Sequence, residues 1–263
     1  MKSKILFPTD FSETANNAFL YALNLAKVLK AEIKLVSVQS TLKNYLDVTE
    51  DNFEDYINKL KNIAKENGLE DIKIDSSLLI GDLLLIILDI INKDQIKYVV
   101  MGTNGQNSLG KKIFGSNTLN VINNSPVPVL VVPDKVKFKD ERNFGYATKF
   151  SHNENKAIAE MTKIADRYQK ALQIVHIENK SMTQEMMAVK NEWEKAFPKS
   201  AILIENNDDV EEGLIHFCLS NQIDVLGIVH RGLSSFERLF TINHSNQLLK
   251  SENVALLVFQ ESK

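Results

Sequence analysis

The chain has 263 residues, of which 44% are hydrophobic and 25% are charged, enough for one large domain or two of ordinary size. The formal net charge of −3 is too small to indicate a nucleic-acid or membrane-surface partner. The longest apolar stretch, residues 78–91, is interrupted by Gly81, Asp82 and Asp89 and is shorter than the roughly 18 residues that a membrane-spanning helix needs. We therefore expect a soluble globular protein with no nucleic-acid or membrane partner.

The amino terminus and the cysteine content favour the cytoplasm. Asp10 follows Met1 too closely to leave room for the apolar core of a signal peptide. The single cysteine, Cys218, cannot form an internal disulfide, and its apolar helical surroundings predict a buried structural thiol. We expect a cytoplasmic protein.

The first half of the chain alternates predicted strands with predicted helices. It opens with an apolar run at residues 4–8 and a polar turn in which Ser12 can cap a helix. Strands are predicted at residues 4–8, 33–38, 72–76, 98–101 and 127–132. Helices are predicted at residues 15–30, 51–67 and 83–92, with a further helix before the last strand.

The second half repeats this unit in a shorter form. Residues 143–151 resemble residues 4–12, and Ser151 with Glu154 has the spacing of a capping box. Helices are predicted at residues 155–169, 183–196 and 210–220, and later strands at residues 172–177, 201–204, 225–229 and 254–259. The sequence therefore predicts two domains, residues 1–136 and 142–263, joined by a solvated charged connector at residues 135–142.

Alternating strands and helices are typical of an α/β fold, here two domains that each hold a five-stranded parallel sheet flanked by helices. Right-handed crossovers favour the strand order 3-2-1-4-5. Ligands of such sheets bind at the carboxyl ends of the strands, where the strand order reverses. In the first copy those ends carry Pro8-Thr9-Asp10 and Gly102-Thr103-Asn104-Gly105, which we expect to face each other.

The glycines after the fourth strand are spaced as in a phosphate-binding loop. Gly102 and Gly105 are followed nine residues later by Gly115 and Ser116, at the start of a predicted helix. Glycine lets backbone N–H groups approach an anion closely, and a helix start attracts negative charge. A P-loop is excluded because Lys112 stands where Ser or Thr should bind Mg²⁺. A dinucleotide fingerprint is excluded because Asn104 replaces its second glycine.

With these residues the chain resembles the universal stress protein family, whose ATP-binding members carry the pattern Gly, two residues, Gly, nine residues, Gly, then Ser or Thr. The strand end at residues 8–12, Gly81 before the third helix and the tail at residues 126–132 also match the family. The resemblance covers both halves. It implies a tandem universal stress protein with two Rossmann-like domains of the adenine nucleotide alpha hydrolase type.

The resemblance implies that the first domain binds ATP, or AMP or ADP, with or without Mg²⁺. Asp10 would bind the adenine amino group or the ribose, or would only complement a helix dipole. The backbone of Val38 would lie along the adenine, and Lys111 and Lys112 would screen the phosphates or remain solvated. The expected nucleotide-binding residues are Pro8, Thr9, Asp10, Val38, Met101, Gly102, Gly105, Gly115, Ser116 and Asn117.

The second copy departs from this pattern. Alignment of Phe114 with Phe240 places Ile228, Arg231, Thr241 and Ile242 opposite the four motif positions, and Lys149 opposite Asp10. Branched side chains would block the close approach of a phosphate. We therefore expect the second domain not to bind ATP in the family manner, and Lys149 and Arg231 to be solvated or to attract another anion.

No dedicated catalytic site is predicted. The five histidines lack metal-ligand spacing, and His176 is expected in the core. The resemblance implies a regulatory, ATP-binding stress-response protein with slow ATP hydrolysis at most. The two domains would pair through their last strands, as a pseudo-dimer that could associate into a homodimer. The alternatives are a nucleotide-free interaction module and an ATP-using ligase, which would need a Ser-Gly-Gly loop where Thr9-Asp10-Phe11-Ser12 stands.

Overall fold

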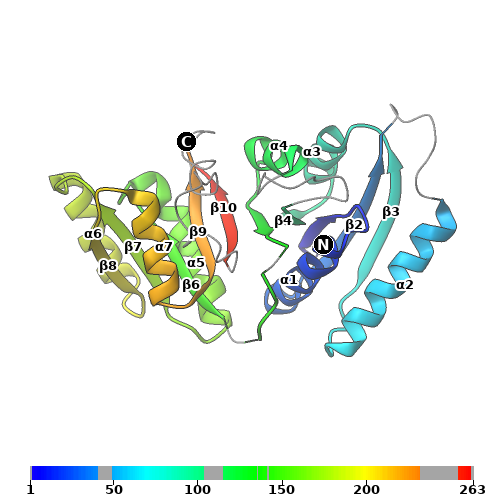
Figure 1. Cartoon of the computed structure of the whole chain (residues 1–263), viewed down its shortest axis with the longest axis horizontal. Helices are drawn as coiled ribbons and strands as arrows, with labels where there is room; N and C mark the ends of the chain where they lie inside the picture. The colour runs from blue at the N-terminus through cyan, green and yellow to red at the C-terminus, as the bar shows by residue number, and fades with distance from the viewer. Residues whose placement is uncertain are drawn as a thin grey trace. The chain divides into compact units, whose positions relative to one another are not determined.

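Parallel strands connected by helices build both halves of the computed structural model (Figure 1), which describes residues 2–40, 49–103, 115–134, 136–140, 142–231 and 254–261. The chain divides into two compact units, residues 1–138 and 139–263. Within the described residues, each unit contains five strands and has its own buried core.

The first unit has the predicted strand order, because its sheet runs β3-β2-β1-β4-β5 with every neighbouring pair parallel. Its strands are β1 (Lys4–Pro8), β2 (Glu32–Gln39), β3 (Ile74–Ile80), β4 (Ile96–Gly102) and β5 (Val129–Val132). Its helices are α1 (Glu13–Leu29), α2 (Glu50–Glu66), α3 (Leu83–Lys93) and α4 (Ser116–Asn124). Right-handed crossovers place α1 and α2 on one face of the sheet and α3 and α4 on the other. In agreement, α1 contacts α2, and α3 contacts α4.

The second unit repeats this topology, with the strand order β8-β7-β6-β9-β10. Its strands are β6 (Asn143–Ala147), β7 (Leu172–Glu178), β8 (Ala201–Asn206), β9 (Ile223–His230) and β10 (Ala255–Gln260). Its described helices are the short 3₁₀ turn η1 (His152–Glu154), α5 (Asn155–Arg167), α6 (Gln184–Ala196) and α7 (Val210–Ser220). The two halves of the chain are therefore copies of one α/β fold.

Short polar side chains begin several of the helices. Ser12 accepts a hydrogen bond from the backbone N–H of Ala15, as its place before α1 predicted. Thr49 and Asp82 cap α2 and α3, and Thr183 and Asp209 cap α6 and α7. These caps satisfy N–H groups that have no partner inside a helix.

The third strand of the first unit was wrongly predicted at residues 72–76. It lies at residues 74–80, because β2 continues to Gln39 and provides backbone partners as far as Ile80. The apolar residues at 78–80 therefore extend the strand, and Gly81 follows with a φ of 153°. This φ favours glycine, so Gly81 allows the chain to turn into α3.

The connector at residues 135–142 is not merely solvated, as the charge pattern had suggested. Val136 is buried, and its carbonyl accepts a hydrogen bond from the side chain of Asn17. The ring of Phe138 lies 5.3 Å from that of Tyr21, edge to face. Arg142 is buried with its guanidinium 4.9 Å from the centre of the Tyr168 ring. Apolar and aromatic contacts therefore hold this segment despite its charges.

Two interpretations of single residues are confirmed. Cys218 is buried, and burial raises the pKa of its thiol to about 12, so the thiol is inert at neutral pH. His176 is buried on β7, with Nδ1 2.8 Å from the Thr148 carbonyl oxygen. Among the residues that the structure describes, no helix is long and apolar enough to cross a bilayer.

The residues that follow α1 and α5 have backbone angles from which a change in stability can be predicted. Lys30 and Gln169 follow these helices with φ of 52° and 58°, a left-handed conformation that disfavours side chains with a Cβ. After α2 the same conformation is taken by Gly68, with a φ of 62°. K30G and Q169G should each stabilise the protein by about 0.5–1 kcal/mol. Urea unfolding followed by circular dichroism measures this, and a lower midpoint for both variants would contradict it.

Candidate functional site

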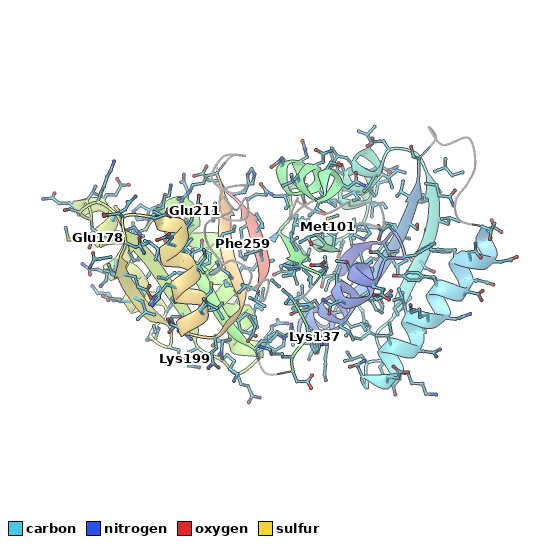
Figure 2. All side chains as sticks on the ribbon, in the orientation of Figure 1. Met101, Lys137, Glu178, Lys199, Glu211 and Phe259 are labelled. Atoms are coloured by element: carbon cyan, nitrogen blue, oxygen red, sulfur yellow. The ribbon has the colours of Figure 1, made fainter. Side chains whose placement is uncertain are left out.

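The sequence-predicted residues of the first unit gather at the carboxyl edge of its sheet. Strand β1 lies between β2 and β4, so Pro8, Val38 and Gly102 lie near the ends of three adjacent strands. Met101, labelled in Figure 2, precedes Gly102 on β4. Gly105, Lys111 and Lys112 lie outside the described residues. The strand order reverses at this edge, which is where α/β sheets bind ligands.

The turn after β1 is held by Thr9, which is buried. Its backbone N–H donates to the carbonyl of Val36 at 2.9 Å, and its hydroxyl accepts from the N–H of Phe11 at 3.2 Å. The same hydroxyl lies 2.9 Å from the phenol oxygen of Tyr56 on α2. The turn is therefore fixed from both the sheet and a helix.

This turn exposes the side chain of Asp10, whose carboxylate accepts a hydrogen bond from the N–H of Ser12 at 3.2 Å. Phe11 has a φ of 67° and packs against Tyr56, with ring centres 4.4 Å apart. Burial, aided by the charge of Asp10, raises the pKa of Tyr56 to about 12 despite the hydrogen bond with Thr9. Tyr56 stays neutral and supports the Asp10 turn.

Glycine is needed at position 102 because of packing, not because of its backbone conformation. A Cβ at this position would lie 2.7 Å from Cγ2 of Thr14 and 3.3 Å from the Thr14 backbone. Its φ lies outside the left-handed region. The glycine thus lets β4 end directly against the first turn of α1.

The start of α4 is attached to the end of β4. The N–H of Gly115 donates to the carbonyl of Thr103 at 2.7 Å, and the hydroxyl of Thr118 donates to that of Gly102 at 3.0 Å. The first turn of α4 thereby lies at the carboxyl edge of the sheet.

Among the residues that the structure describes, no side chain caps α4, in contrast to α1, α2 and α3 of the same unit. Gly115 occupies the cap position with an ordinary φ of −66° and cannot supply a side-chain acceptor. Ser116 and Asn117 follow it on the exposed surface. The first N–H groups of a helix have no intrahelical partner and attract anions. Gly115, Ser116 and Asn117 therefore have the geometry of an anion-binding helix start.

The corresponding edge of the second unit is built differently. The sheet registers place Val229, not Ile228, opposite Gly102. Leu6 pairs with Val99, its counterpart Gly145 pairs with Leu226, and Gly102 and Val229 each lie three residues further on. The alignment of Phe114 with Phe240 used residues outside the described part of the chain, so it did not report the register of the sheet. Thr241 and Ile242 lie outside the described residues.

The capping box predicted for Ser151 and Glu154 is also wrong. Ser151 accepts from the N–H of Asn153 at 3.4 Å, while the Glu154 side chain is turned into the interior. There it accepts from the Thr148 hydroxyl and binds Arg231. Lys149 is solvated, as interpreted, but Arg231 is not, because its side chain is only 20% exposed.

Comparison with known proteins supports this assignment of the fold. The profile of the universal stress protein family matches residues 1–133, half of the chain. Universal stress protein MJ0577 of Methanocaldococcus jannaschii is 34% identical in an alignment of length 160 that covers 51% of this chain and 97% of that protein. MJ0531 of the same organism is 29% identical in an alignment of length 140 that covers 49% of this chain and 81% of that protein.

A solved universal stress protein from Archaeoglobus fulgidus covers the whole chain. It aligns with 99% of this chain and 97% of its own, with a TM-score of 0.71 and 19% sequence identity. At that identity the likeness shows the fold alone. The family profile and the identity to MJ0577 go further: the chain belongs to the universal stress protein family.

The packing of Gly102 against Thr14 can be tested by a double-mutant cycle. G102A should destabilise the protein by about 1–3 kcal/mol, because the new methyl overpacks the junction of β4 and α1. T14S removes Cγ2, the nearest atom at 2.7 Å, so G102A/T14S should recover much of that loss. Urea unfolding of the four proteins measures the coupling, and additive single effects would contradict it.

Proposed function

We propose that the first unit binds an adenine nucleotide, preferably ATP, and that the protein acts as a nucleotide-responsive regulator of a stress response rather than as a dedicated enzyme. The observation that carries this proposal is the uncapped start of α4, attached to the end of β4 where the strand order reverses. Membership of the universal stress protein family supports it. Slow ATP hydrolysis would accompany binding, with water as the nucleophile.

The proposed pose follows the strand ends. The phosphates would bind the N–H groups of Ser116 and Asn117 in the first turn of α4, with Gly102 and Gly105 allowing close approach. The adenine and ribose would lie over Pro8, Thr9 and Met101 along the backbone of Val38, with Asp10 accepting from the adenine amino group or the ribose. Mg²⁺ would accompany the triphosphate, since it usually binds substrate phosphates and few carboxylates.

The second unit is proposed not to bind ATP in this way. Val229 adds a branched side chain where the first unit has Gly102, and the adjacent Arg231 is engaged by Glu154. A nucleotide bound to the first unit would alter the surface that a partner protein meets.

A charge introduced at Asn117 separates nucleotide binding from folding. N117D should leave stability unchanged or raise it by about 0.3–1 kcal/mol, because a carboxylate in the first turn complements the helix dipole. The same carboxylate should repel phosphate and weaken ATP binding about tenfold or more, equivalent to about 1.4 kcal/mol. Isothermal titration calorimetry with Mg-ATP and thermal unfolding measure the two effects.

Q184E is the matched control, since it makes a similar amide-to-carboxylate change at an exposed residue in the first turn of α6 in the second unit. It should leave ATP affinity unaltered. G115V is a second variant, because among the described residues an added Cβ would meet only the Thr103 carbonyl oxygen, at an ordinary 3.4 Å. Unchanged ATP affinity in both N117D and G115V would refute the proposed phosphate position. No ATP binding by the wild type would favour the nucleotide-free interaction module.

We also propose that the two units pair through their last strands, β5 and β10, with dimerisation of two chains as a further step. Strand β5 is entirely apolar, and β10 is apolar until Gln260. The opposite edge strands carry polar residues, namely Asp75, Ser76 and Ser77 on β3 and Glu205 and Asn206 on β8. Unprotected apolar edges promote association, so this asymmetry favours pairing at β5 and β10.

Amide exchange tests the pairing. The carbonyl of Pro128 accepts from the N–H of Val99 on β4, and that of Val132 accepts from the N–H of Thr103, which follows β4. Val129 and Val131 alternate with these residues along the strand, so their N–H groups point to the other side of β5. We expect these two amides to exchange as slowly as that of Leu130. Fast exchange at Val129 and Val131 would contradict pairing, and protection that falls on dilution of the 29.8 kDa chain would indicate pairing between two chains instead.

A further inference from the structure

A buried carboxylate lies at the carboxyl edge of the second unit. The side chain of Glu154 is only 2% exposed. It accepts from the Thr148 hydroxyl and from the N–H of Lys149, the latter at 3.3 Å, and it pairs with the guanidinium of Arg231. Two neutral donors and a cation thus surround one carboxylate, as they would an anionic ligand.

The first unit has a much smaller residue at the matching position. Thr9 and Thr148 are equivalent, because each follows the first strand and donates its N–H to a carbonyl of the second, Val36 or Val175, at 2.9 Å. Six residues further on the first unit has Ala15 and the second has Glu154. The carboxylate therefore enters a position where the other copy has only a methyl group.

An additional donor lies close to this cluster. The Tyr146 hydroxyl is buried and has no hydrogen-bond partner among the residues that the structure describes. The charge of Arg231 acts on this phenol, opposing the rise of its pKa that burial causes. The first unit has Phe7 at this strand position, so the extra hydroxyl is particular to the second unit.

Arg231 extends the cluster to the last strand. Its Nε lies 3.7 Å from the Glu261 carboxylate, which also accepts from the side chain of Asn153 at 3.4 Å. The ends of β6, β9 and β10 are thereby connected across the edge where α/β sheets bind ligands.

We propose that the second unit retains a latent site for a phosphate-type anion and that Glu154 occupies it as an internal substitute for the ligand. Its donors are the Thr148 hydroxyl, the N–H of Lys149 and the guanidinium of Arg231, all of which bind Glu154 in this structure. Removal of the carboxylate frees these donors, and an anion of similar size then takes its place. This inference does not depend on nucleotide binding by the first unit.

The single tryptophan provides a reporter confined to this unit. Trp193 is buried, its ring lies 5.7 Å from that of Phe150, and its Nε1 donates at 2.7 Å to Asn155, the neighbour of Glu154. Inorganic phosphate is titrated at constant ionic strength into the wild type, E154A and E154Q while tryptophan emission is recorded. E154Q removes only the negative charge and so frees Arg231, while its amide oxygen still accepts from Thr148 and Lys149 and preserves the fold if E154A does not.

We expect a saturable change in emission for the folded Glu154 variants, with apparent phosphate binding at least tenfold tighter than in the wild type. E261Q is the control, because it removes the charge of Glu261, the exposed partner of Arg231, and leaves Glu154, the buried partner. Its response to phosphate should equal that of the wild type. Adding R231M to either Glu154 variant should abolish the gain. A wild-type response equal to that of the folded Glu154 variants, or a folded E154A without any response, would overturn the proposal.

Discussion

The candidate site depends on the attachment of α4 to the end of β4. Two donors, the N–H of Gly115 and the hydroxyl of Thr118, bind the last carbonyls of β4. These bonds place the start of α4 at the carboxyl edge of the sheet, near the ends of the neighbouring strands β1 and β4. Among the described residues, no side chain caps this helix start. Gly102 makes the arrangement possible, because a Cβ there would collide with Thr14. Packing and hydrogen bonding, rather than unusual backbone angles, thus form the junction between β4 and α4.

The second unit uses its corresponding edge for an internal ion pair. Taking Glu154 and Arg231 out of water is costly, and a buried pair offsets that cost only when further hydrogen bonds satisfy it. Thr148 and the N–H of Lys149 provide such bonds to Glu154. Removing one partner of a buried pair typically costs about 3–5 kcal/mol. The same fold therefore presents free donors in one copy and satisfied donors in the other.

The strands and their order could be predicted because each is a short apolar run and right-handed crossovers leave few arrangements. Tyr56 could not be predicted, because its contact with Thr9 joins residues 47 positions apart and no local pattern marks it. Glu154 was misread because its spacing from Ser151 satisfies a local rule, while Arg231, 77 positions away, determines its orientation. The connector was misread because Val136 and Phe138 are only two apolar residues among many charges.

The ion pair at the carboxyl edge of the second unit also affects strand β10. Arg231 contacts both Glu154 and Glu261, so one guanidinium ties η1 to the residue that follows β10. Strand β10 pairs with β9 along its whole length, from Ala255 to Gln260. Its last residues are thus held both by the backbone ladder and by side-chain charges. A rigid apolar edge pays less conformational entropy on association than a frayed one does. The ion pair that we propose to replace a ligand would therefore also favour the proposed pairing of β10.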